Sequence, residues 1–340
     1  SSSSSPSSSS NCIRKSMLHN GNNRLFCNGR FMINKHNGIF FVTLTFLIGT
    51  LTIFFICDAP FLWNEISPLI PIAIALLSII MFTNLFKTTF SDPGILPRAS
   101  IDETRDEEEK QLERSETSAT DGNTSSIHPT LTRTIEVTVN GVSIRLKRCG
   151  TCQLYRPPRC SHCSICNCCI LNFDHHCPWV GNCVGLRNYR YFYFFLLSLS
   201  FLIILTFSSS IAHLFLLTRH TALIDAMKES PLSLVVLIIC FFSFFSISCL
   251  SVFHSYLLTT NLTTNEDIKG TFSSKRRPPI TNPFNLGSLY KNCLSRLCSP
   301  ELPSLIDSRG FKKEVNDIMD ESIMIRSSAL SVSTENTILS

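Results

Sequence analysis

Charged residues are scarce in this 340-residue chain, where Asp, Glu, Lys and Arg together make up only 16%. Soluble domains carry about 25% charged residues, so this composition argues against a wholly soluble protein. The net charge of +5 is also small for a nucleic-acid-binding protein, and we expect no nucleic-acid partner. No apolar segment typical of a signal peptide lies near the start, so no secretory leader is expected.

The chain has instead four long apolar runs, at residues 39–57, 68–86, 191–217 and 232–258. Each run is long enough to cross a bilayer as a helix, and four are too many for the core of a soluble protein. None contains Asp, Glu, Lys or Arg in its interior, which argues against a channel or transporter.

The distribution of basic residues predicts the orientation of these runs. Arg30, Lys35, Lys87 and Arg98 flank the first pair, whereas residues 58–65 between them contain no Lys or Arg. By the positive-inside rule, both termini and residues 91–190 are expected to be cytosolic, with 58–65 a short lumenal turn. Arg219 and Lys228 in the second lumenal loop are a mild exception.

The remaining segments differ in composition. Residues 1–38 open with a serine-rich run and are expected to be a disordered N-terminus, 91–132 an acidic linker and 259–340 a C-terminal tail. Alternating β-formers around Asn140-Gly141 predict a hairpin over residues 133–147, which leads into a cysteine-rich domain within residues 133–190.

The cysteine-rich segment contains one ligand pattern twice, Cys-x2-Cys-x9-His-x6-Cys, with the second copy 14 residues after the first. Three thiols and one imidazole are the donor set of a closed structural zinc site, so two structural Zn²⁺ ions are expected. The matched histidines argue against a disulfide scaffold. The two sets are Cys149, Cys152, His162 and Cys169, and Cys163, Cys166, His176 and Cys183.

One spare thiol in this segment has the neighbours of a nucleophile. Cys177 belongs to neither ligand set, His175 lies two residues before it, and Asp174 precedes that histidine. An acid that orients an imidazole, which in turn takes a thiol proton, is the arrangement that activates a cysteine. The pattern predicts a zinc scaffold that presents Cys177 near the bilayer, where a membrane-associated thiol, lipid or acyl chain fits best.

The sequence Asp174-His175-His176-Cys177, followed by Pro178 to Gly185 and Asn188-Tyr189, resembles the cysteine-rich domain of the DHHC protein S-acyltransferases, or palmitoyltransferases. The resemblance covers about residues 30–300 and implies an all-α polytopic membrane protein with four transmembrane helices and a cytosolic two-zinc cysteine-rich domain between helices 2 and 3. Three further motifs are similar to those of the family: Asp92-Pro93-Gly94, Thr263-Thr264-Asn265-Glu266, and Asn282-Pro283-Phe284 through Asn292.

The resemblance implies a reaction and a role for each site residue. Cys177 would take a fatty acyl group, most of all palmitoyl, from acyl-CoA and pass it to cysteines of membrane-associated substrate proteins, with His175 as base and Asp174 as its partner. It also implies that Trp179 lies against the acyl chain, Thr264 lies near the active site, and Arg156 and Arg159 meet the CoA phosphates. For the two arginines, a plain loop role is equally open.

Finer features leave alternatives open. The sequence around Gly29-Arg30-Phe31 resembles the Golgi and endoplasmic reticulum branch of the family that includes Ras palmitoyltransferases, which implies a location in those organelles. An accessory subunit is a further expected partner. Cys160 and Cys168 are expected to be passive thiols or secondary acylation sites, and the sequence assigns no role to Cys293 or Cys298. A membrane-anchored zinc module without chemistry is the main alternative.

Overall fold

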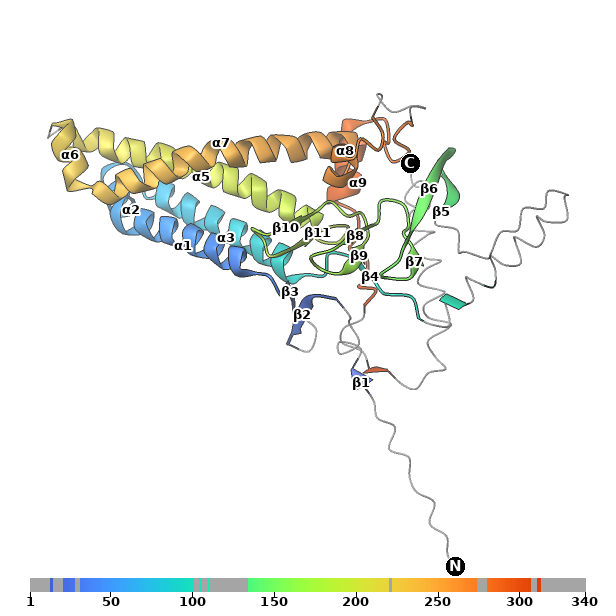
Figure 1. Cartoon of the computed structure of the whole chain (residues 1–340). Coiled ribbons are helices and arrows are strands. Elements are labelled where there is room, and N and C mark those ends of the chain that lie inside the picture. The colour runs from blue at the N-terminus through green and yellow to red at the C-terminus, as the bar shows by residue number, and fades with distance from the viewer. Residues whose placement is uncertain are drawn as a thin grey trace, which may run out of the picture.

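Four long helices lie side by side, and a small region of short strands sits at one end of them (Figure 1). This computed structural model describes residues 21–27, 31–100, 134–219, 222–273 and 280–306, together with residues 13–14, 104–105, 109 and 311–312. The serine-rich run at residues 1–10 and most of the predicted acidic linker lie outside these residues. Parts of the predicted disordered N-terminus and of the predicted C-terminal tail are instead ordered, as strands within residues 23–34 and helices within residues 264–297.

The four predicted apolar runs are helical. They correspond to α1 (Gly38–Cys57), α3 (Leu69–Phe90), α5 (Tyr189–Leu217) and α7 (Pro231–Thr260), and each is long and apolar enough to span a membrane. The 22-residue α3 is about 33 Å long at 1.5 Å per residue, which matches a hydrocarbon core of about 30 Å. The expected arrangement is therefore confirmed, with four membrane helices and the cysteine-rich region between the second and third.

The segment predicted as a short polar turn is helical instead. Residues Ala59–Glu65 form α2, which continues α1 as a single 28-residue apolar stretch. Asp58 at the junction is fully buried and accepts hydrogen bonds from Ser210 Oγ (2.9 Å) and His213 Nδ1 (2.6 Å) on α5. A carboxylate in an apolar bundle requires such partners, and the sequence could not show that α5 supplies them.

Helix α5 is the most enclosed of the four because it packs against both α3 and α7. The core between the helices is built from large apolar side chains, among them Phe54, Leu62, Ile74, Met81, Phe192 and Leu196. Helices α2 and α6 (Leu223–Glu229) lie at the end of the bundle opposite the cysteine-rich region (Figure 1).

The cysteine-rich region consists of short antiparallel strands. The predicted hairpin is confirmed, since β5 (Thr134–Val139) pairs with β6 (Val142–Cys149) around Asn140 and Gly141, whose φ angles of 48° and 78° suit a tight turn. The strands after this hairpin are β7 (Leu154–Tyr155), β8 (Ser161–Cys163), β9 (Cys168–Ile170), β10 (His175–Cys177) and β11 (Asn182–Val184).

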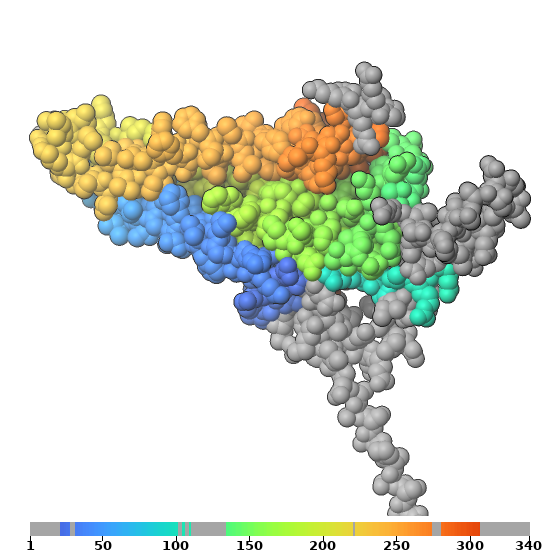
Figure 2. Space-filling view, in the orientation of Figure 1, coloured from blue at the N-terminus to red at the C-terminus, as the bar shows by residue number. Residues whose placement is uncertain are grey.

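Segments from both sides of the cysteine-rich region complete the fold. Before α1, β2 (Asn23–Phe26) pairs with β3 (Phe31–Asn34). After α3, β4 (Ile95–Leu96) pairs with β9. Near the two ends of the chain, β1 (Ile13–Arg14) pairs with β12 (Phe311–Lys312). After α7, the chain forms α8 (Thr264–Ile268) and α9 (Leu289–Leu297), which lie against the cysteine-rich region in the space-filling view (Figure 2).

The Asp92-Pro93-Gly94 turn fixes how α3 leads into the cysteine-rich region. Asp92 Oδ1 accepts hydrogen bonds from the backbone N–H groups of Gly94 and Ile95, both at 2.9 Å. Its other oxygen pairs with Arg187 at 3.0 Å and accepts from Ser304 Oγ at 2.6 Å. The turn thereby aligns β4 with β9 and holds the 301–306 segment against this region.

Candidate active site and zinc sites

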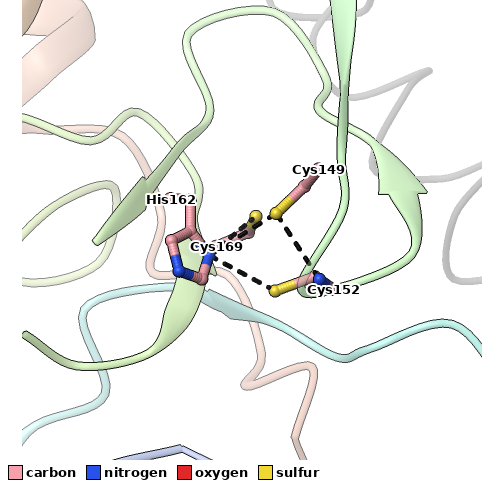
Figure 3. Close-up of side chains that lie close together, drawn as sticks. All are labelled: Cys149, Cys152, His162 and Cys169. Atoms are coloured by element: carbon pink, nitrogen blue, oxygen red, sulfur yellow. Dashed lines mark hydrogen bonds between the residues drawn. The ribbon is translucent and has the colours of Figure 1, made fainter. Parts of the chain in front are cut away.

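The first predicted ligand set comes together in one place (Figure 3). The Sγ atoms of Cys149, Cys152 and Cys169 lie 3.5, 3.5 and 3.8 Å from Nδ1 of His162. A tetrahedral zinc ion with Zn–S bonds of about 2.3 Å and Zn–N bonds of about 2.0 Å separates sulfur and nitrogen by about 3.5 Å. The donors of this site therefore fit zinc.

The second set has the same geometry. Nδ1 of His176 lies 3.8 Å from Sγ of Cys163 and 3.4 Å from the Sγ atoms of Cys166 and Cys183. The six cysteine ligands of the two sites are free of disulfides, and their thiols are buried. A Cys₃His donor set with no open position suits a structural ion that stabilises the fold of a segment with little apolar core.

The six-residue spacing between histidine and last cysteine has a structural reason. Each pair sits on a hairpin that places the two residues opposite each other, His162 with Cys169 on β8–β9 and His176 with Cys183 on β10–β11. The β10–β11 turn contains Gly181, whose φ of +65° favours glycine and where a Cβ would lie only 3.0 Å from Phe40 Cβ.

Asparagine side chains fix the β10–β11 hairpin to the membrane helices. Asn182, which faces Cys177 across the hairpin, donates from Nδ2 to the carbonyls of Thr89 (3.0 Å) and Ser91 (2.9 Å) at the end of α3. Asn188 likewise donates to Thr88 O at 3.1 Å. The hairpin is therefore held at one end of the helical bundle.

Asp174, His175 and Cys177 form the arrangement that the sequence predicted. Asp174 is buried, and its Oδ2 lies 2.8 Å from His175 Nδ1, which leaves the other imidazole nitrogen for Cys177. Cys177 is 7% exposed and belongs to the same apolar cluster as Phe192 and Leu196 of α5. The thiol thus lies where the cysteine-rich region meets the core between the helices.

The pKa values of this group shift in the directions that an activated thiol requires. Burial raises the pKa of the Cys177 thiol, but the hydrogen bond and charge of His175, with the N–H groups of Val180 and Trp179, lower it overall. Burial lowers the pKa of His175, yet Asp174 and Cys177 raise it to about 10. These directions favour a thiolate–imidazolium pair.

Thr264, expected to lie near the active site, hydrogen-bonds directly to the Asp174 carboxylate. Its N–H donates to Asp174 Oδ1 at 3.0 Å and its Oγ1 to Asp174 Oδ2 at 2.5 Å. Burial raises the pKa of Asp174, but the hydrogen bond and charge of His175 outweigh that effect and lower it to about 2. Asp174 therefore remains a carboxylate that orients His175.

A capping box explains the spacing of the Thr263-Thr264-Asn265-Glu266 motif. Thr263 Oγ1 accepts from Glu266 N at 3.1 Å, and the Glu266 carboxylate accepts from Thr263 N at 2.9 Å. This reciprocal pair starts α8 and so places Thr264 against Asp174.

The two arginines expected to meet CoA phosphates have different surroundings. Arg159 is buried with Glu266, each side chain 6% exposed, with a closest N–O distance of 2.7 Å, and it also donates to Asn261. Its guanidinium further stacks over Phe284 at 4.5 Å. These partners occupy the Arg159 guanidinium, so the structure gives it a bracing position, whereas Arg156 is only half-buried.

The other residues singled out from the sequence differ in their exposure and in their distance from Cys177 along the chain. Trp179 is 62% exposed in the β10–β11 turn, two residues after Cys177. Cys168 is buried beside the second zinc site and Cys160 is half-buried against the first, so their positions favour the passive role over acylation. The half-buried Cys293 and the exposed Cys298 lie on and just after α9.

His254 of α7, which was not predicted from the sequence, lies beside Asp174 and His175. Its ring nitrogen, one from His175 and a carboxylate oxygen of Asp174 all lie within 4.8 Å of one another. A single histidine within an otherwise apolar run was the available signal. Both Asp174 oxygens already accept hydrogen bonds from His175 and Thr264, and His254 is hydrogen-bonded to Tyr189 instead, so these contacts do not favour a third metal site.

Comparison with known proteins identifies the family that the sequence motifs resemble. The sequence model of the DHHC palmitoyltransferase family matches residues 142–271. The chain is 47% identical to the human palmitoyltransferase ZDHHC14 over 298 residues, which cover 88% of this chain and 60% of that protein. It is 48% identical to mouse palmitoyltransferase ZDHHC18 over 299 residues, covering 88% and 76%.

The chain spans about 60% of the length of the first of these relatives, and 76% of the second. Identity at this level over nearly the whole chain, together with two Cys₃His clusters and an Asp-His-His-Cys hairpin at one end of four membrane helices, leads to one assignment. The chain belongs to the DHHC palmitoyltransferase family.

Proposed function

We propose that this protein is an S-acyltransferase that moves a fatty acyl group, palmitoyl most of all, from acyl-CoA to cysteines of membrane-associated proteins. The observation that supports it best is Cys177, paired with His175 and Asp174, at the junction of the cysteine-rich region and the apolar core of the helices. A thiol in this position can meet a water-soluble CoA thioester and keep its acyl chain in an apolar environment.

The reaction has two transfers through one cysteine. The Cys177 thiolate attacks the thioester carbonyl of acyl-CoA, and CoA leaves as a thiol with the proton held by His175. An acceptor thiol then gives its proton to His175 and attacks the Cys177 thioester, which restores the Cys177 thiolate. Asp174, held by Thr264, keeps His175 oriented through both transfers.

The zinc ions would be held by the two Cys₃His sets and would supply structural stability to the two hairpins. Because His176 is a ligand and lies between His175 and Cys177, the second site fixes the backbone on which both reacting side chains stand. Neither site offers an open position in its donor set, so no step of the transfer is assigned to a metal.

The CoA phosphates would bind a basic group that includes Arg156. Burial lowers the pKa of Lys269, and the nearby positive charges of Arg156 and Lys147 lower it further. These three cations therefore lie near one another, next to α8, which contacts Asp174. The exposed Trp179 would contact the acyl chain as it enters from the bilayer surface.

The positive-inside pattern supports a cytosolic location for both termini and the cysteine-rich region. The proposed membrane is that of the Golgi or endoplasmic reticulum, from the resemblance of the residues around Gly29-Arg30-Phe31 to that branch of the family. In that orientation α2 and α6 face the lumen. Acyl-CoA is then on the same side of the membrane as Cys177. Tags at residues 5 and 120 should both be open to protease from the cytosolic side; opposite accessibility of the two tags contradicts this orientation.

The deciding experiment is incubation of the detergent-purified protein with labelled palmitoyl-CoA. The wild-type protein should acquire a label that hydroxylamine removes, and should pass it to an added thiol acceptor. A zinc-loaded, folded wild-type protein that takes up no label would support instead the zinc module without chemistry.

A further inference from the structure

A second histidine lies directly behind the catalytic one. His254 of α7 is 1% exposed, and its ring centre lies 5.9 Å from that of His175 with an angle of 39° between the planes. The His175 side chain, by contrast, is 27% exposed. Only His175 can therefore meet a substrate thiol, and His254 can act on the reaction only through its neighbours.

A short series of contacts holds the His254 ring in one orientation. Its Nδ1 lies 3.2 Å from the buried hydroxyl of Tyr189 on α5, a hydrogen-bonding distance. The guanidinium of Arg296 on α9 lies 4.2 Å from the centre of the Tyr189 ring and donates to Leu262 O. Side chains from α5 and α9, together with α7 itself, thus determine where this imidazole sits and the plane of its ring.

Phe192 completes a wall against the catalytic histidine. It packs edge-on against both imidazoles, 5.2 Å from His175 and 5.0 Å from His254. Asp174 holds one edge of the His175 ring through Nδ1. Phe192 and His254 pack against the same ring and limit its rotation. Removal of the His254 ring would leave an empty space beside His175 into which that imidazole could turn.

We propose that His254 is a positioning residue for acyl transfer, which keeps the free nitrogen of His175 aimed at Cys177. The inference rests on the proposed transferase function. The last part of α7 and the start of α8 then hold the catalytic pair at two points, His254 against His175 and Thr264 against Asp174. Misplacement of a reacting group by about 1 Å can cost about 100-fold in rate.

The test compares His254→Leu, His254→Asn and His254→Gln with a matched control, His213→Leu. His213 is also a buried histidine of a membrane helix with polar partners, Asp58 and Ser233, but it lies near α2 and α6, at the other end of the bundle. Each variant is measured for zinc content, melting temperature, and the kcat and KM of thioester formation with palmitoyl-CoA.

His254→Leu should lower kcat by up to about 100-fold with little change in KM, because orientation rather than binding is lost. His254→Asn keeps an acceptor for the Tyr189 hydroxyl near the position of Nδ1 and should recover most of the rate, whereas His254→Gln should not. The control His213→Leu should lower the melting temperature and leave the kcat of the folded fraction unchanged.

Three results would overturn the inference. One is a wild-type kcat in His254→Leu. Another is equal kcat in His254→Asn and His254→Gln, which remains decisive if the leucine variant does not fold. The third is a loss of rate that follows melting temperature equally in the His254 and His213 variants. A wild-type protein that forms no thioester would refute the transferase proposal itself, separately from this inference.

Discussion

The two zinc-ligand hairpins share one plan and differ in the role of the cysteine next to their histidine. In β8–β9, His162 faces Cys169 and Cys163 faces Cys168; in β10–β11, His176 faces Cys183 and Cys177 faces Asn182. The residue after the histidine is a cysteine in both. In the first hairpin it is a ligand of the next zinc site, and in the second it is the thiol beside His175.

The difference arises because the series of sites stops at two. Cys149, Cys163 and Cys177 lie at intervals of 14 residues, as do Cys152 and Cys166, but the next position in that second series is Val180. A third Cys-x2-Cys pair is therefore missing, and no metal takes the Cys177 thiol. A metal ligand and a nucleophile need the same deprotonated sulfur, so the cysteine that neither ligand set uses is the one available for the proposed acyl transfer.

The residues before each histidine sharpen this contrast. Cys160-Ser161 stands in the first hairpin where Asp174-His175 stands in the second. The first hairpin pairs with β4, whereas the second is fixed to the end of α3 and meets Thr264 of α8. The first hairpin thus braces the region, and the second, fixed to the helices, carries the residues of the proposed active site.

The largest expected effect comes from substitution of Cys177, the cysteine of the second hairpin that belongs to neither zinc-ligand set. Cys177→Ser should abolish thioester formation with palmitoyl-CoA, because a hydroxyl in place of the thiol lacks a thiolate. Cys168→Ser, which changes a buried thiol that serves neither ligand set, is the matched control and should keep the label. Equal loss in both at equal folded yield would show that the comparison of the hairpins assigns the nucleophile wrongly.

Substitution of the two adjacent histidines, one at a time, should separate zinc binding from thioester formation. His176→Ala removes a ligand and should lower zinc content and yield, since a structural zinc site contributes roughly 10 kcal/mol or more to folding. His175→Ala should keep zinc content and melting temperature and slow thioester formation by about 10²–10⁴-fold. The measurements are the zinc content and the melting curve of each variant. Loss of zinc in His175→Ala but not in His176→Ala would refute the ligand assignment that is based on the 14-residue repeat.

A smaller effect is expected where the first hairpin is joined to the catalytic group. Arg159, three residues before His162, pairs with Glu266 of α8, the helix that also carries Thr264. Glu266→Met should destabilise the protein by about 3–5 kcal/mol, since it leaves a buried guanidinium without its partner. The double variant Arg159→Met with Glu266→Met should recover part of the melting temperature. No recovery would mean that the pair does not couple the two regions.

The smallest expected effect distinguishes the two zinc sites by their outer contacts. Asn34 of β3 is fully buried and donates from Nδ2 to Sγ of Cys166 at 3.1 Å, a contact to the second site from outside the repeat. Asn34→Leu should cost about 1–3 kcal/mol and speed chelator release of one zinc ion of two. Asn84→Leu, which loses only a bond to a helix carbonyl, is the control. If Asn34→Leu released zinc at the same rate as the wild-type protein, the contact between Asn34 and Cys166 would not stabilise the second site.

The sequence predicted what local spacing controls. A fixed offset of 14 residues identified both ligand sets and the spare thiol, and the length of the apolar runs identified the helices. Both depend on short-range geometry, the reach of a hairpin and the rise of a helix. The hairpin around Asn140 was predictable from turn chemistry in the same way.

Contacts between distant segments were not predictable in this way. Arg159 meets Glu266 across 107 residues, Asp58 meets His213 across 155, and Tyr189 meets His254 across 65. Even where a residue belongs to a motif, as Glu266 and Tyr189 do, the sequence does not show its partner, because the pairing depends on which helices pack together. For this reason the sequence did not show the bracing position of Arg159, and it predicted a turn at residues 58–65 where a helix forms.

The bond from Thr264 to Asp174 also sets an order of events during synthesis. Thr264 lies 90 residues after its partner, and Glu301 lies 114 residues after Arg187. At about 5–20 residues per second, Asp174 leaves the ribosome several seconds before the residue that will hold it. A growing chain therefore contains Cys177 and all eight predicted zinc ligands before Thr264 has been made. In the proposed mechanism, the thiol would become reactive only after α7 and α8 have been synthesised.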